Sequence, residues 1–208
     1  MNNKPFAEII ESSLDSFLAQ CWQWDDFPTF GSLVQVENDG LTIFGCVASI
    51  QTGSSDPMRY PFPYQKTLDE LKKEQPQIFA FLKTTFRVHV LGHQKAGGPI
   101  YTLPPQPGKI HSFVTNCPQS SAQNFFAKPD FLYLLFSSAS TITHFDDLLL
   151  AILQQLTAGK KLSAVTLDAF FKTLSLLTGN DYRKLKLLFK RVESTNSHQK
   201  TTVSKHFH

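Results

Sequence analysis

The stretch that decides the fold is "FGSLVQVENDGLTIFGCVASI", Phe30–Ile50. Apolar and polar residues alternate on both sides of the turn sequence Asn-Asp-Gly at 38–40. Asp-Gly between two alternating runs is a strong hairpin signal, because the tight turn that matches strand twist needs positive φ. The stretch therefore predicts two antiparallel strands, Phe30–Glu37 and Leu41–Ile50, joined by this turn.

Further strand-like segments lie on both sides of this hairpin, separated by turn residues. They are "FAEIIES" (6–12), "SFLAQC" (16–21), Phe86–His93, "IYTL" (100–103) and a final strand around "IHSFV" (110–114). Short strands with Gly-rich turns favour closure, since a barrel removes the exposed edges of a small open sheet. We therefore expect a small antiparallel β-barrel of six or so strands.

A loop and a helical insert interrupt the strands. The segment 51–65, "QTGSSDPMRYPFPYQ", contains three prolines and predicts an irregular loop. Thr67 and Glu70 have the spacing of a capping box, so a short helix should start there, within an insert near 67–83. Pro76 should end or kink that helix, and "QIFAFLKT" should form another short turn of helix.

The second half of the chain shows helical periodicity. Asp130 should cap a helix over "FLYLLFSS", and Thr143 should cap a longer one that Gly159 ends. Ser163 should begin the next, and Asn180 or Asp181 should cap the last. One apolar stripe runs along the longer helix through Phe145, Leu148, Leu149, Ile152, Leu153 and Leu156. Short connections between the helices favour a small antiparallel bundle.

These patterns predict an α+β protein, a barrel followed by a C-terminal helical bundle. The expected domains are a barrel over 1–117, a helical module over 118–193 and a disordered polar tail over 194–208. No apolar run reaches the ~18 to 20 residues that a membrane span needs. The N-terminus lacks a secretory pattern, so we expect a cytoplasmic protein, or one of the plastid stroma if it is organellar.

The order of elements resembles the HAS-barrel family. The resemblance rests on the hairpin, the Asp-Pro-x-Arg of "SSDPMRYPFPY", "TLDELKKEQPQIFAFLKTTFRVHVLG" and "YTLPPQPGKIHSFV", with "DYRKLKLLF" near the end. The chain is similar to stand-alone HAS-barrel proteins of cyanobacteria and their relatives. In HerA-type translocases and rotary ATP synthases such a barrel precedes the nucleotide-binding domain, which implies a structural or docking role.

The sequence argues against an enzyme. No G-x-x-x-x-G-K-[ST] occurs, so we expect neither nucleotide binding nor hydrolysis. His89 and His93 lie roughly 13 Å apart along one strand face, too far to share a metal. His206 and His208 could hold a metal adventitiously. A thiol hydrolase, with Cys46 or Cys117 near His111, is the least favoured hypothesis, and we expect no cofactor, no metal and reduced, mostly buried cysteines.

Two surfaces are candidates for binding a partner. The Pro-rich loop carries Arg59, Tyr60, Phe62 and Tyr64, residue types that interfaces favour, although the loop could instead cover one barrel mouth. From Lys160 onward there are ten basic residues and three acidic ones, against a net charge of +3 for the chain. Arg183, Lys184, Lys190 and Arg191 therefore form either a solvated helix face or a nucleic-acid site.

We accordingly expect a non-enzymatic docking or assembly module that contacts a protein partner or larger complex through loops at the barrel rim. The alternative is a nucleic-acid-binding accessory protein that uses the basic C-terminal helix.

Overall fold

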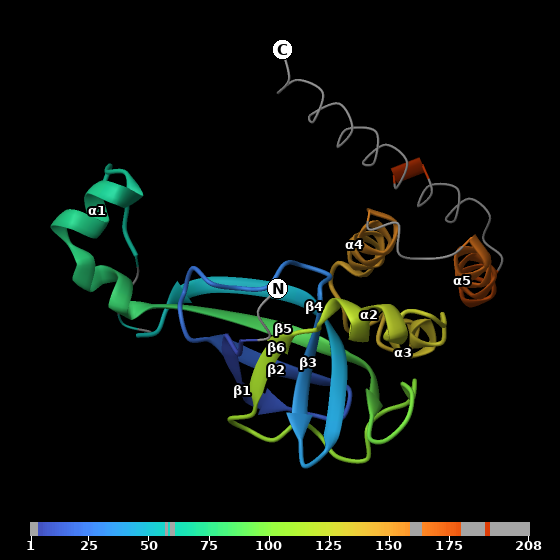
Figure 1. Cartoon of the computed structure of the whole chain (residues 1–208). Coiled ribbons are helices and arrows are strands. Elements are labelled where there is room, and N and C mark those ends of the chain that lie inside the picture. The colour runs from blue at the N-terminus through green and yellow to red at the C-terminus, as the bar shows by residue number, and fades with distance from the viewer. Residues whose placement is uncertain (1–3, 57, 59–60, 159–163, 180–189, 192–208) are drawn as a thin grey trace.

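The computed structural model describes residues 4–56, 58, 61–158, 164–179 and 190–191. Within them, six strands form a closed antiparallel barrel in the order β1-β2-β5-β4-β3-β6, and helices follow the barrel (Figure 1). The predicted α+β class and closed barrel are confirmed. The strands are β1 (Ala7–Ser12), β2 (Ser16–Cys21), β3 (Leu33–Asn38), β4 (Leu41–Ser54), β5 (Leu82–Gln94) and β6 (Phe113–Asn116). The helices are α1 (Leu68–Glu74), the 3₁₀-helix η1 (Pro76–Phe81), α2 (Gln119–Phe125), α3 (Phe131–Ser137), α4 (Phe145–Ala158) and α5 (Ala164–Leu177).

The β3–β4 hairpin has the predicted turn. Asn38 pairs with Leu41 at its end, and Val36 pairs with Ile43 further in. Asp39 has φ 49° and Gly40 has φ 77°. Both central residues therefore have positive φ, as the tight turn requires.

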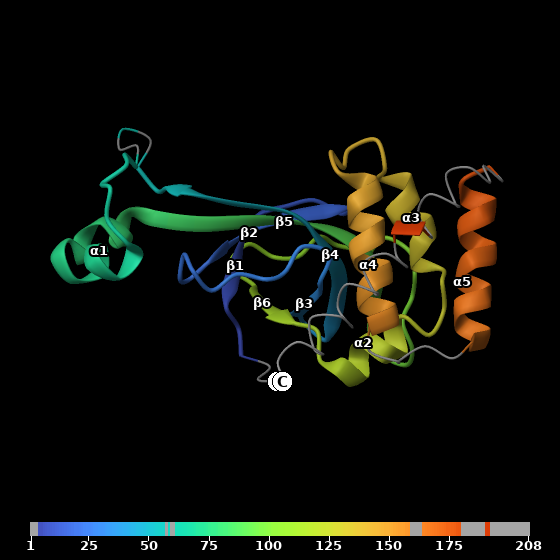
Figure 2. The same cartoon turned by 90° about the horizontal axis from the view of Figure 1, so that it is seen from above.

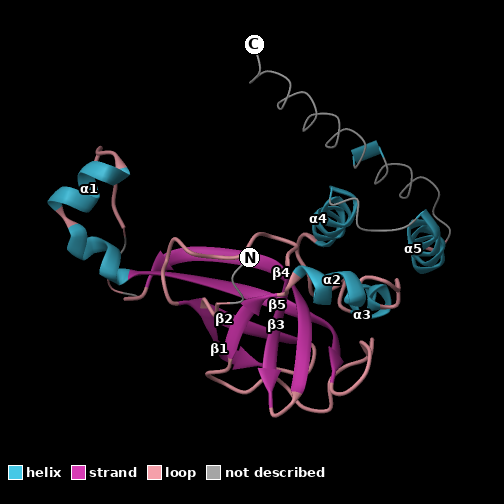
Figure 3. Ribbon diagram, viewed as in Figure 1, coloured by secondary structure: helices cyan, strands magenta, loops and turns pink. Residues whose placement is uncertain are grey.

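Two apolar clusters hold the molecule together, one on each face of the sheet. Val34 and Val36 point into the barrel interior, whereas Leu33 and Phe44 lie on the outer face beneath the helices. Phe125 of α2 is fully buried between the barrel and the helices, with its ring centroid 4.9 Å from that of Phe44. The helices therefore cover one side of the barrel, as the ribbon coloured by secondary structure shows (Figure 3).

The helical half agrees with the sequence in its apolar stripe and differs at the helix starts. All stripe residues of α4 are buried except Phe145, which is half-buried. The helix begins at Phe145, two residues after the expected cap Thr143. Asp130 precedes α3 but makes no capping bond with its side chain, because its own backbone is helical, with φ −63° and ψ −23°. Several predictions lie outside the described residues: the helix end at Gly159, the helix start at Ser163, the helix after Asn180 and the 194–208 tail. Lys190 and Arg191 are described, and both are helical.

The expected strand 100–103 is wrong. Only Ile100 pairs, through two backbone hydrogen bonds with His93 of 2.8 and 2.9 Å. Pro104 and Pro105 follow Leu103 and have no N–H to donate, so no strand could continue past Leu103.

β4 and β5 are longer than the sequence predicted. Gln51–Ser54, expected to be loop, continues β4, and Leu82 rather than Phe86 begins β5. The extra residues pair with one another, Thr52 with Thr84 and Ser54 with Leu82. The two strands leave the barrel as a ribbon that carries α1 and η1 at its far end, on the side away from α4 and α5 (Figure 2). We call residues 50–86 the arm.

Candidate functional site

The tip of the arm folds through local signals rather than through a core. Glu70 N donates to Thr67 Oγ1 at 3.3 Å and Thr67 N donates to Glu70 Oε2 at 2.7 Å, which completes the predicted capping box. The Glu70 carboxylate also accepts from Thr67 Oγ1 at 2.8 Å, and the bonds that it accepts from Thr67 N and Oγ1 lower its pKa. Pro76 ends α1 and opens η1, as predicted, because it has no N–H to continue the helix. Neither α1 nor η1 contains a buried residue, so apolar side chains remain accessible.

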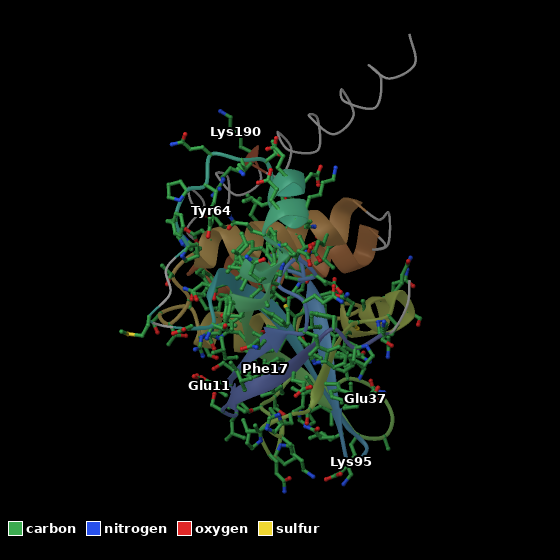
Figure 4. All side chains as sticks on the ribbon, turned by 90° about the vertical axis from the view of Figure 1, so that its left-hand side faces the viewer. Glu11, Phe17, Glu37, Tyr64, Lys95 and Lys190 are labelled. Carbon is green, nitrogen blue, oxygen red and sulfur yellow. The ribbon has the colours of Figure 1, made fainter. Side chains whose placement is uncertain are left out.

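These accessible side chains line a groove of about 510 Å³ between the Pro-rich loop and the two short helices. The Phe62 and Tyr64 rings pack against each other at 4.3 Å between centroids, yet Phe62 is 62% exposed. Figure 4 shows Tyr64 on the arm, well above Phe17 of the barrel core. The full lining is Ser54, Met58, Pro61, Phe62, Tyr64, Leu71, Gln77, Ile78, Phe79, Phe81 and Leu82.

The β2–β3 connection attaches the arm to the barrel. The Trp24 indole stacks on Phe79, with centroids 5.7 Å apart and planes at 17°. Thr84 Oγ1 donates to the Trp24 carbonyl at 2.5 Å and contacts Thr52 Oγ1 at 2.7 Å. Lys72 Nζ lies 3.8 Å from an Asp25 carboxylate oxygen. These contacts therefore fix the ribbon and the short helices that carry the groove to the β2–β3 connection.

The structure brings two of the four loop candidates together. Phe62 and Tyr64 form one wall of the groove. Arg59 and Tyr60 lie outside the described residues. The opposite wall, which includes Ile78 of η1, was not among the candidates. Its only sequence signal is the apolar run in "QIFAFLKT", on a helical turn too short to bury it.

The basic candidates occupy another part of the molecule. Arg183 and Lys184 lie outside the described residues. Lys190 and Arg191 are exposed, and Arg191 Nη2 donates to Asp147 Oδ1 of α4 at 2.5 Å. Part of this positive charge is therefore neutralised by α4.

Among the described residues no cysteine thiol bonds a histidine ring, although Cys46 and His89 are paired across β4 and β5. Burial raises the pKa of the Cys46 thiol to about 12, and that of Cys117 likewise to about 12, which leaves both protonated and unreactive. His111 is exposed and bonds Glu8 Oε2 at 3.2 Å. His89 is buried, its Nδ1 has no partner among the described residues, and burial lowers its pKa. No cluster of three or more metal-binding side chains occurs in the described part of the chain.

Residues 6–96 match the family model of the HAS barrel domain. The match extends from the start of β1 past the end of β5 and so includes the arm. Residues 6–96 therefore carry a HAS barrel domain. No curated protein sequence matches the chain. Among the described residues, no helix combines the length and apolar character needed to cross a bilayer.

Proposed function

We propose that the protein is a docking or assembly module that binds a protein partner through the groove on its arm. The observation that supports this most is an apolar groove of about 510 Å³ on helices that bury none of their own residues. Such accessible apolar surface marks interaction sites on soluble proteins. HAS barrels are generally found in larger assemblies, which agrees with a docking role.

The groove has the residue types of a binding site. Phe62 and Tyr64 supply large rings at small cost in side-chain entropy, and Met58, 90% exposed, adds an adaptable apolar side chain. Arg59 and Tyr60 belong to the same Pro-rich segment of the sequence and remain candidates for the same interface.

Affinity purification of the full chain from its native organism, followed by mass spectrometry, tests the proposal. Changing both Phe62→Ala and Tyr64→Ala should remove the specific partners, because the rings form one wall of the groove. Leu176→Ala is a matched control: Leu176 is 69% exposed on α5, outside the arm. Identical partners for the double variant and the wild type would refute docking through the groove.

The alternative is nucleic-acid binding through the basic C-terminal region. It is supported by the excess of basic residues after Lys160 and by the exposed Lys190, which makes no ion pair with any described residue. A mobility-shift titration at two salt concentrations tests it, since phosphate contacts weaken steeply as salt rises. Absence of a shift at low salt would exclude this function.

A further inference from the structure

One edge of the arm ribbon is unpaired within the part of the chain that the structure describes. Up to Val47 the β4 edge is closed: Val47 N donates to Ser32 O at 3.1 Å, and Gly31 N donates to Val47 O at 2.8 Å. From Ala48 to Ser54, no described residue pairs with β4 on the side away from β5. On the other strand of the ribbon, the Thr84 hydroxyl donates to the carbonyl of Trp24 in the β2–β3 connection.

The register shows which backbone groups face this open edge. Ser55 N donates to Phe81 O at 2.7 Å, so this pair forms ladder hydrogen bonds. Such pairs alternate along an antiparallel ladder, which places the peptide groups of Gly53 and Gln51 toward β5. The N–H and C=O groups of Ile50, Thr52 and Ser54 therefore point outward, at a spacing that an added strand would match.

The open edge lacks the usual protection against strand addition. Natural edges are blocked by charged side chains, prolines or a covering element. The β4 segment Ser49–Ser54, "SIQTGS", has no charge and no proline. An uncharged, unpaired edge on a ribbon that projects from the barrel is a template for binding an extended segment.

The two faces of the ribbon differ in chemistry beside this edge. On one face, Ser54 and Leu82 open into the apolar groove. On the other, Gly53 and Lys83 border a hollow of about 340 Å³, and a Cβ at Gly53 would meet nothing within 4 Å. Within the described residues, Lys83 forms no ion pair. Because Gly53 has no side chain, a neighbouring acidic residue could reach over it to Lys83.

We propose that the β4 edge of the arm binds an extended segment of a partner protein as an added strand. Its apolar side chains would enter the groove, and its alternate, acidic side chains would pair with Lys83. Successive residues of a strand point to opposite faces, so one segment can place apolar side chains in the groove and acidic side chains near Lys83. A second copy of β4 does not fit, since "SIQTGS" offers no acid. The inference rests on the proposed docking function and specifies its partner.

A displayed library of random 12-residue peptides, selected on the full-length protein, tests the inference. Enriched peptides should alternate apolar and acidic residues over at least four positions. Their affinity should fall about tenfold in Thr52→Pro, which removes an outward N–H, as for the loss of one hydrogen bond. Thr52→Val is the matched control: it loses the hydroxyl contact with Thr84, keeps the N–H and should bind within about twofold of wild type.

Amide exchange on the wild-type protein gives a second readout that does not depend on a variant folding. The amides of Ile50, Thr52 and Ser54 should exchange more slowly when peptide is bound. Equal binding by the proline and valine variants, no protection of these amides, or no enriched alternating peptide would overturn strand addition. If peptide binding is lost in the Phe62→Ala, Tyr64→Ala variant but kept in Thr52→Pro, groove docking stands and strand addition fails. If neither variant changes the binding, both proposals fail.

Discussion

Replacing Phe79 with Ala should loosen the tip of the arm while the barrel keeps its stability. Phe79 is half-buried, and its stacking on Trp24 is the ring contact that joins η1 to the β2–β3 connection. Such a pair contributes about 0.5–1.5 kcal/mol beyond the area that it buries. Because the ring is also partly buried, we expect the free energy of local unfolding of the arm tip to fall by about 1–2 kcal/mol. This corresponds to a roughly 5- to 30-fold rise in the fraction of molecules whose arm tip is open. The barrel should not respond, because neither helix of the arm contributes to its core.

Hydrogen exchange measures this local opening directly. The amides of Leu71 and Gln75, which donate to carbonyls one turn earlier in α1, should exchange about 5 to 30 times faster in the variant, and those of β3 should not change. Phe113→Ala is the control, since it removes an edge contact of 5.3 Å with Trp22, outside the arm. Unchanged exchange in α1, or an equal increase throughout the barrel, would refute the view that this stack attaches an otherwise independent tip.

Three further outcomes are expected. Phe125→Ala should destabilise the protein by about 3–5 kcal/mol in urea unfolding, because it leaves a cavity between the barrel and the helices. Tyr133 is 53% exposed, so the control Tyr133→Ala should change the stability by no more than about 0.5 kcal/mol. Similar losses in the two variants would contradict the view that Phe125 fills the core between barrel and helices. Burial lowers the pKa of His89, so as pH falls the imidazole is protonated in the unfolded chain before it is protonated in the folded protein. The free energy of unfolding should therefore decrease as pH drops below 6.5, and His89→Gln should make this decrease smaller. An unchanged pH dependence in the variant would show that other groups cause the decrease. Cys21 and Cys46 are buried, Cys117 is half-buried, and burial raises the pKa of each thiol to about 12, so a thiol reagent at pH 8 should label them mainly on unfolding; rapid labelling of Cys21 or Cys46 in the native protein would contradict their burial.

The sequence predicted one wall of the groove but not the other. Phe62 and Tyr64 were identifiable because prolines keep their segment out of the sheet and leave the rings no core to enter. The opposite wall was not, since Ile78 and Phe79 look like ordinary apolar helix residues until their helix is seen to lie away from the barrel. Arg59, Tyr60, Arg183 and Lys184 remain predictions from the sequence.

The sequence by itself determined the elements whose signals are local. Asp39-Gly40 sets the hairpin turn, Thr67 with Glu70 sets the start of α1, and the alternation of Val34 and Val36 sets which face enters the barrel. Each depends on residues a few positions apart.

Only the tertiary structure decided the two-stranded ribbon of the arm. Gln51–Ser54 and Leu82–Thr85 are too polar and too short to predict strands alone, and they pair because the barrel strands that precede and follow them already lie side by side. The open β4 edge has the same origin: β3 begins only at Leu33, so it runs out while β4 continues to Ser54. Pairing between segments about thirty residues apart depends on where the rest of the chain places them, which no local pattern contains.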